Sequence, residues 1–282
     1  MRTIAVANQK GGCGKTTTAV NLSAALARAH QRVMLVDLDP QGHATLGFGY
    51  EPGAIEKTVH NVLVEPNFPL RRALLDTDIP WLDLVPSNVL LSGAELQLAR
   101  FKQRHLILRD KLQTAGAEYD VCVIDCPPSL GLLTLNALLA STDVIVPVQV
   151  HYYAMEGLKQ LFETARIIRE RFHPCCIRIM GLLLTLAEDN TLFGKQIQRQ
   201  MRTYFGKLVF RTTIHRTVRL AEAPSAGQSV LTYAPSSRGA VEYKALADEI
   251  LNEKMNDRPL AKSLETAQSG TNCSRTRTTV TS

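Results

Sequence analysis

The stretch Lys10-Gly11-Gly12-Cys13-Gly14-Lys15-Thr16-Thr17 decides the fold of this 282-residue chain. It follows an apolar, β-branched run at Thr3–Ala7 and precedes a helical pattern at Thr16–Ala29. Glycines let the backbone curl until successive N–H groups point inward as an anion nest, and the positive end of the following helix faces the same anion. A strand, a glycine-rich loop and a helix in this order predict a phosphate-binding loop.

This loop carries two lysines. Lys15 is expected to reach the β and γ phosphates of a nucleotide, and the Thr16 hydroxyl to ligate Mg²⁺. The common pattern G-x-x-x-x-G-K-[ST] would put glycine at position 9, where the chain has Gln9, and Lys10 opens the loop instead. The full set expected to contact the nucleotide is Lys10, Gly11, Gly12, Cys13, Gly14, Lys15, Thr16 and Thr17.

Aspartates follow two further apolar runs. The run at Val33–Val36 leads into Asp37 and Asp39, and the run at Val121–Ile124 leads into Asp125. The carboxyl ends of parallel strands gather at the edge where ligands bind, so these acids are expected to face the phosphates. There they would hold the waters of Mg²⁺ or orient an attacking water. One aspartate at a strand end is more typical of a turn or a cap, so the argument depends on all three together with the loop.

Short apolar runs alternate with longer helical patterns along the chain. The runs are Thr3–Ala7, Val33–Val36, Leu82–Val85, Val121–Ile124, Val144–Val148 and Ile177–Leu184. The helical patterns cover 16–29, 88–114, 131–140, 154–172, 191–205 and 238–254. This rhythm predicts an α/β fold of the P-loop NTPase type, a mostly parallel twisted sheet with helices on both faces. We expect one ATPase-like domain at 1–254 and a disordered, Thr/Ser-rich tail at 255–282, which lacks apolar periodicity.

Composition excludes several classes of protein. With 45% hydrophobic and 21% charged residues, the chain is neither disordered, collagen-like nor a disulfide scaffold. No stretch approaches the roughly 18 uninterrupted apolar residues of a membrane span, and the N-terminus lacks the apolar core of a signal peptide. We therefore expect a cytoplasmic protein that does not bind membranes. Its six cysteines contain no C-x-x-C pair and are expected to be thiols.

Positive charge is concentrated in one segment. The net charge is +6, but Lys195–Arg219 alone holds seven cations and no acid, which leaves −1 for the rest of the chain. A smaller cluster at 100–111 has five cations and one acid. Such clusters are often solvated helix faces, yet a polyanion such as duplex DNA gains affinity from each phosphate that Lys or Arg neutralises. Nonspecific DNA binding is therefore a hypothesis, and local charge density nominates Arg199 and Arg202 as contacts.

Taken together, the motifs resemble the ParA family of partition ATPases. This family lies within the P-loop ATPases with a deviant Walker A motif, a class that includes MinD and the nitrogenase iron protein. The resemblance covers roughly 2–252. Besides the loop, it rests on the following segments: 36–42 (VDLDPQG), 124–129 (IDCPPS), 147–149 (PVQ), 154–158 (AMEGL) and 216–225 (RTVRLAEAPS).

This resemblance implies an ATP- and Mg²⁺-dependent homodimer in which Lys10 contacts the nucleotide bound by the other subunit. It assigns Lys10, Lys15 and Asp39 to catalysis, with Asp39 positioning the attacking water, and it assigns Thr16, Asp37 and Asp125 to the metal. It also implies nonspecific binding of double-stranded DNA in the ATP state through Arg216 and Arg219. The resemblance further implies a ParB-like activator, association with the nucleoid and a role in chromosome or plasmid segregation.

The chain departs from the family pattern at three positions. His215 stands where many relatives have proline, and Thr217 where they often have asparagine, so the entry to the basic loop is expected to differ in shape. Cys13 replaces an aliphatic residue, and its place near a helix N-terminus and two lysines raises the hypothesis of a low-pKa, reactive thiol.

Three alternative functions stay open. A MinD-like positioning ATPase would act on another cargo, such as a division site, chemotaxis cluster or organelle, and its membrane-bound form needs an amphipathic basic terminus, which the tail does not supply. An electron-transfer iron protein needs cysteines that bridge a cluster between subunits, and neither Cys122 nor Cys126 is convincingly placed for this. A metabolic kinase needs a pocket for an acceptor substrate, and the sequence shows none.

Overall fold

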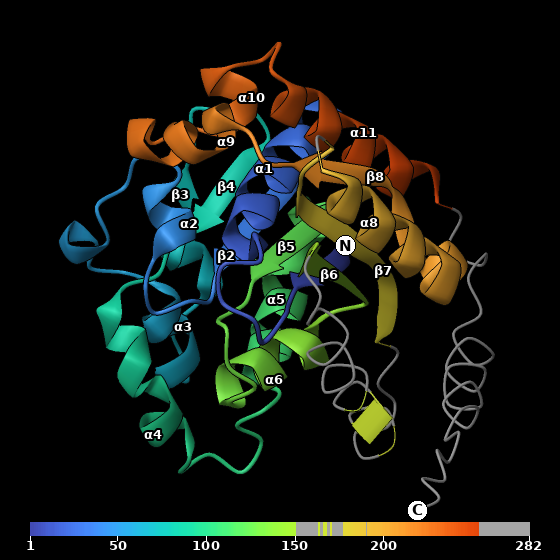
Figure 1. Ribbon diagram of the computed structural model, residues 1–282. Coiled ribbons are helices and arrows are strands. Elements are labelled where there is room, and N and C mark those ends of the chain that lie inside the picture. Colours follow the sequence, from blue (N-terminus) through green and yellow to red (C-terminus); the bar gives the residue numbers. More distant parts are fainter. Residues whose placement is uncertain (151–162, 164–165, 168–169, 171–176, 190, 254–282) are drawn as a thin grey trace, which may run out of the picture.

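The structure, a computed structural model, describes residues 1–150, 163, 166–167, 170, 177–189 and 191–253 (Figure 1). Within these residues eight strands form one sheet in the order β3-β4-β2-β5-β1-β6-β7-β8. The strands are β1 (Arg2–Val6), β2 (Val33–Asp37), β3 (Leu75–Asp76), β4 (Leu82–Val85), β5 (Val121–Asp125), β6 (Asp143–Gln149), β7 (Arg178–Ala187) and β8 (Val209–His215). Every neighbouring pair is parallel except β3 and β4. The predicted α/β class is confirmed.

Helices cover both faces of this sheet (Figure 1). They are α1 (Lys15–Arg28), α2 (His43–Leu46), α3 (Val59–Val64), α4 (Ala94–Leu98), α5 (Ile107–Ala115), α6 (Leu132–Ala140), α8 (Leu192–Phe205), α9 (Val218–Glu222), α10 (Val230–Tyr233) and α11 (Arg238–Asn252). Side chains of β1 alternate between two apolar cores, because successive residues of a strand point to opposite faces. Ile4 and Val6 pack with α1, α10 and α11. Ala5 and Ala7 pack with α3, α4, α5, α6 and α8.

Strand register places the functional segments at one edge of the sheet. Asp125, the last residue of β5, lies opposite both Val6 of β1 and Asp37 of β2. The glycine-rich loop leaves β1 at this same edge and enters α1 through Gly14, whose φ of 84° suits a residue without a side chain. The loop and the aspartates therefore converge, as the sequence predicts.

The predicted single helix over 88–114 is wrong. A 3₁₀ turn at Val89–Gly93 leads into α4, and further turns separate α4 from α5. Tertiary hydrogen bonds stabilise this break, because the Asn136 side chain donates to the carbonyl of Arg104 at 2.8 Å and accepts from the N–H of Leu108 at 3.2 Å. A partner in α6 cannot be read from the local pattern of 88–114.

Two strands are absent from the prediction, the short β3 and the edge strand β8. β8 reads as Val-Phe-Arg-Thr-Thr-Ile-His, with polar residues at its centre. Its backbone N–H groups are satisfied by α11, since Glu249 accepts from Arg211 and Thr212, and Glu242 accepts from His215. Helix α11 thus covers β8 at the edge of the sheet. The polar composition of β8 prevents its prediction as a strand from the sequence alone.

Most of the predicted helix at 154–172 and the predicted tail at 255–282 lie outside the described residues. None of the helices in the described part of the chain is both long enough and apolar enough to cross a bilayer.

Candidate nucleotide-binding site

The phosphate loop is fastened at its two ends to the neighbouring strands. At its start, the Asn8 side chain donates to the carbonyl of Pro147 in β6 at 2.7 Å and accepts from the N–H of Lys10 at 3.1 Å. Near its end, the Thr185 hydroxyl of β7 donates to the carbonyl of Cys13 at 2.8 Å. Sequence reasoning missed Asn8 and Thr185, because neither belongs to a recognisable motif and both act on partners distant in the chain.

The two lysines of the loop occupy different environments. Lys15 is only 7% exposed, and its ammonium donates to the carbonyl of Lys10 at 3.0 Å, so its charge lies inside the loop. Lys10 itself is exposed. The first turn of α1 contains no acid that would compete for an anion at this helix N-terminus. The loop therefore presents one internal cation, a helix N-terminus and one surface cation.

Asp125 is fully buried at the end of β5, and neither of its carboxylate oxygens accepts a hydrogen bond of good geometry from the described residues. Burial and the neighbouring Asp37 raise its pKa well above the ordinary value, while the nearby Thr16 hydroxyl and Lys15 oppose the shift. Two buried oxygens without partners fit a cation. The described residues contain no set of three His, Cys, Asp or Glu side chains that could hold a metal unaided. A cation here would thus rely on waters and phosphates, as Mg²⁺ commonly does.

Asp37 and Asp39 support the turn that follows β2. Asp37 is fully buried and accepts hydrogen bonds from the backbone and hydroxyl of Thr45 at 2.8 and 2.7 Å and from the N–H of Asp39 at 3.2 Å. Burial raises the pKa of Asp37 to about 6 despite these hydrogen bonds. Asp39 is 8% exposed and accepts from the N–H of Gln41 at 3.0 Å through Oδ1. Asp37 thus accepts three hydrogen bonds of good geometry from the described residues, whereas Asp125 accepts none that meets the same geometry.

A cavity of about 410 Å³ lies at the carboxyl ends of β6 and β7. It is lined by Gln149, Val150, Leu186, Glu188, Thr191, Gly194 and Arg216. Thr185, whose hydroxyl holds Cys13 of the loop, also accepts at its carbonyl from the N–H of Val150, which lines the cavity. Leu186 has a φ of 51°, a strained conformation for a bulky residue, and such strain clusters at functional sites.

The Cys13 thiol is buried in the loop, and burial raises its pKa although Lys15 and Lys10 act in the opposite direction. The hypothesis of a low-pKa thiol at this position is therefore wrong, because desolvation of the thiolate outweighs the two cations.

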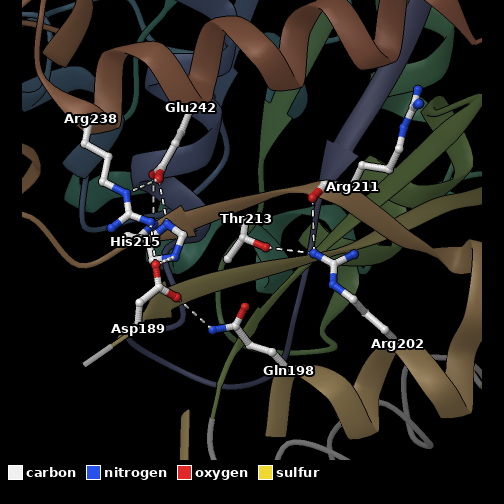
Figure 2. A network of polar contacts seen from close by, with 8 residues as sticks. All are labelled: Asp189, Gln198, Arg202, Arg211, Thr213, His215, Arg238 and Glu242. Carbon is white, nitrogen blue, oxygen red and sulfur yellow. Dashed lines mark hydrogen bonds and ion pairs between the residues drawn. The ribbon is translucent and has the colours of Figure 1, made fainter. Parts of the chain in front are cut away.

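The four arginines nominated for DNA differ in their contacts. Arg199 is exposed and takes part in none of the ion pairs found among the described residues. The Arg202 guanidinium donates to the carbonyls of Phe210 and Arg211 at 2.8 and 3.1 Å and to the Thr213 hydroxyl at 2.9 Å, which ties α8 to β8 (Figure 2). That guanidinium is already occupied by three acceptors.

Acids that lie outside the basic block along the sequence approach it in space. Arg216 lies 3.4 Å from Glu188, and Arg219 lies 2.8 Å from Glu222. A block that is free of acids along the sequence is thus partly neutralised in the fold. Lys195, Arg199 and Lys207 are exposed and belong to no ion pair in the described part of the chain.

Comparisons with known proteins agree with this geometry. A family described as "AAA domain" matches residues 1–176. The chain is 45% identical over 247 residues to the sporulation initiation inhibitor protein Soj of Bacillus subtilis, which covers 88% of this chain and 97% of that protein. It is 43% identical over 250 residues to the chromosome partitioning protein ParA of Myxococcus xanthus, which covers 89% of this chain and 88% of that one.

Among solved structures, a cobyrinic acid a,c-diamide synthase from Mycobacterium smegmatis with bound ADP and magnesium has a TM-score of 0.78 and 36% identity. That match covers 89% of this chain and 94% of the other. The sequence identity extends over nearly the whole chain, and the loop and sheet-edge geometry described above is that of a P-loop ATPase. The chain therefore belongs to the ParA family of P-loop partition ATPases.

Proposed function

We propose that this chain binds Mg·ATP at the loop and hydrolyses it to ADP and phosphate. The observation that carries the proposal is the fully buried carboxylate of Asp125, which lies near the Thr16 hydroxyl and the internal ammonium of Lys15. Lys15 and the backbone N–H groups of 11–17 hold the phosphates, and Thr16 and Asp125 hold Mg²⁺. When bound, Mg²⁺ neutralises the charge that develops on the transferred phosphoryl group. The solved relative with ADP and magnesium supports this assignment.

Within the site, each protein group has a separate task. Oδ1 of Asp39 accepts from the N–H of Gln41, which leaves Oδ2 to orient the attacking water. Asp37, held by Thr45 and by the N–H of Asp39, positions Asp39, and any contact it makes to Mg²⁺ goes through water. The cavity accommodates the sugar and base, since it lies at the same carboxyl edge of the sheet as the loop and Thr185 is hydrogen-bonded to both Cys13 of the loop and Val150 of the cavity.

The nucleotide further controls assembly. Two subunits pair face to face when each holds ATP, and the exposed Lys10 of each neutralises charge on the nucleotide of the other, as an arginine finger does. The ATP-bound dimer binds duplex DNA nonspecifically through Arg199, Arg216 and Arg219. The chromosome-partitioning names of the relatives support a role in segregating a chromosome or plasmid on the nucleoid, with a ParB-like activator.

Retention on duplex DNA with ATP, with ADP and without nucleotide, across a salt series, tests this function. We expect retention with ATP alone, with affinity falling steeply as salt rises because Lys and Arg displace counterions from phosphates. Lys15→Ala should remove both ATP binding and retention. Equal retention with and without ATP, or retention insensitive to salt, would contradict the proposal.

A further inference from the structure

Thr45 lies at the third position of the short helix α2, soon after the turn that carries Asp37 and Asp39, and it is fully buried. Its N–H and its hydroxyl both donate to Oδ2 of Asp37, at 2.8 and 2.7 Å. The same hydroxyl accepts from the N–H of Ser87 at 2.9 Å. Thr45 thus joins the turn after β2 to the segment that follows β4.

The direction of this hydrogen-bond chain is fixed at its start. The N–H of Ser87 can only donate, so it occupies a lone pair of the Thr45 oxygen and leaves the hydroxyl hydrogen for Asp37. Ser87 is itself fully buried, two residues beyond the end of β4, where Val85 lies opposite Val36 of β2. The hydrogen-bond chain therefore starts at the carboxyl edge of the sheet.

Two donors on one oxygen fix the orientation of the Asp37 carboxylate. Its other oxygen, Oδ1, accepts from the N–H of Asp39 at 3.2 Å. Asp39 is held in this position, because its Oδ1 accepts from the N–H of Gln41 at 3.0 Å and its carbonyl accepts from the N–H of Gly42 at 2.9 Å. A rotation of Asp37 would therefore move the carboxylate that orients the attacking water, and misplacement of a reacting group by about 1 Å can cost about 100-fold in rate.

Close packing leaves this turn little room for another arrangement. Gly42 has a φ of 63°, and a Cβ added to it would lie 2.9 Å from Cγ of Pro52 and 3.3 Å from the carbonyl oxygen of Ser87. The segment after β4 thus contacts the turn through its backbone as well as through Thr45.

We propose that the Thr45 hydroxyl is a positioning group for ATP hydrolysis, which holds Asp37, and through it Asp39, in the orientation that directs the attacking water. This inference rests on the proposed function, because it takes Asp39 as the group that orients water. Since Thr45 acts only through these two aspartates, loss of its hydroxyl lowers kcat and leaves nucleotide affinity nearly unchanged.

Thr45→Val tests this role, because it removes the hydroxyl and keeps a side chain of similar shape. We expect kcat for ATP to fall about tenfold, while KM and the dissociation constant of a fluorescent ATP analogue stay within about twofold of wild type. Thr45→Ser restores the hydroxyl and should recover kcat to within about twofold.

Thr58→Val is the matched control for the loss of a buried hydroxyl. Thr58 is also fully buried, and its hydroxyl accepts from the N–H of His60 at 3.3 Å. None of the hydrogen bonds among the described residues joins Thr58 to Asp37. This variant should therefore keep the wild-type kcat.

Amide hydrogen exchange without nucleotide gives a readout that does not depend on hydrolysis. The N–H groups of Asp39 and Gln41 donate to the two aspartates, so in Thr45→Val they should exchange about fivefold faster than in the wild type. In Thr45→Ser and Thr58→Val they should exchange as in the wild type.

Combining Thr45→Val with Asp39→Ala shows whether Thr45 acts through Asp39. The hydrolysis rate of the double variant should lie within about twofold of Asp39→Ala alone, because a positioning group has no effect once the group that it positions is absent. Release of phosphate from γ-labelled ATP is sensitive enough to compare these slow variants.

The outcomes separate the inference from the proposed function. Wild-type kcat or wild-type exchange in Thr45→Val, a change confined to KM, a Thr45→Ser variant as slow as Thr45→Val, or single losses that multiply in the double variant would each overturn the inference. If the wild-type protein hydrolyses no ATP, the proposed function fails instead, and hydrogen exchange still decides whether Thr45 holds the turn. If thermal unfolding shows that Thr45→Val does not fold, Thr45→Ala, which also lacks the hydroxyl, takes its place.

Discussion

At the scale of single residues, the site depends on which aspartate oxygens the protein leaves without partners. Asp37 and Asp125 lie opposite each other on adjacent strands, and both are fully buried. Thr45 and the N–H of Asp39 occupy the oxygens of Asp37, whereas those of Asp125 accept no well-formed hydrogen bond from the described residues. Asp37 therefore supports a turn, and we propose Asp125 as the carboxylate that receives a ligand.

Asp39→Ala tests the catalytic assignment. Removing the carboxylate that orients water should lower the rate of ATP hydrolysis about 100-fold, a typical contribution of such a group. Affinity for ATP should change by less than about threefold, because phosphates and Mg²⁺ are held elsewhere. Phosphate release and a fluorescent ATP titration measure the two effects. Asp110→Ala, on the exposed face of α5, is the control, and wild-type turnover in Asp39→Ala would refute the assignment.

The sequence was sufficient to predict that the loop and the three aspartates lie together at one edge of the sheet, because a strand, glycines, a lysine and strand-end acids are local patterns. It could not identify Asn8, Thr45 or Thr185, whose roles arise from partners brought close by the sheet. It likewise nominated Arg202 from charge alone, whereas the fold directs this side chain to backbone carbonyls of β8.

At the scale of elements, the edge strand β8 is held from both sides. Glu249 and Glu242 of α11 accept from its N–H groups, and Arg202 of α8 donates to its carbonyls. The sequence pattern did not predict β8, and it predicted the helix at 88–114 without a break. Both errors have the same cause. In both places side chains from distant elements form hydrogen bonds with the backbone, whereas hydrophobic periodicity reports only local preference.

Arg199 and Arg202 of α8 should respond differently to truncation. Arg202→Ala should lower the free energy of unfolding by about 1–3 kcal/mol, because it leaves three acceptors of β8 without their charged donor. Arg199→Ala should leave stability within about 0.5 kcal/mol and weaken DNA binding while reducing the salt slope by about one. Urea denaturation and DNA titrations across salt check both. Equal effects of the two variants on stability would show that the hydrogen bonds of Arg202 do not contribute to the free energy of unfolding.

A second tie between elements lies at the amino ends of β1, β6 and β7. Asp143 of β6 forms ion pairs with Arg2 of β1 at 2.9 Å and Arg178 of β7 at 2.7 Å. Burial alone would raise its pKa, but the two arginines outweigh burial and hold the pKa below the ordinary value. A lowered carboxyl pKa contributes stability that is present above the unfolded-state pKa and is lost as pH falls through the folded-state pKa.

Asp143→Asn should therefore lower the free energy of unfolding by about 2–4 kcal/mol at neutral pH, since it leaves two partly buried arginines with only the more distant Glu253, at 3.9 Å from each. Its deficit relative to wild type should shrink below about pH 4, where the wild-type carboxylate also becomes protonated. Glu118→Gln breaks an exposed pair with Arg71 and should cost less than about 0.5 kcal/mol. A deficit for Asp143→Asn that does not change with pH would contradict the assignment.

At the scale of the whole molecule, the carboxyl edge of the sheet gathers the loop, the aspartates and the cavity, and it leaves Lys10 exposed. A Cβ added to Gly11 or Gly12 would meet no atom within 4 Å, so this side of the loop faces open space. An exposed cation on an open loop is available to a second nucleotide. Pairing of two copies would enclose both nucleotides and place each Lys10 against the phosphates of the other subunit.

Molar mass by light scattering, with a non-hydrolysable ATP analogue and Mg²⁺, tests this claim most directly. The wild-type protein should double its mass on adding the analogue, and Lys10→Ala should stay single while still binding it, because its own site keeps Lys15. Lys57→Ala, which removes another exposed lysine, should pair as the wild type does. A wild-type protein that stays single when loaded with the analogue, or a Lys10→Ala variant that pairs equally well, would contradict the account.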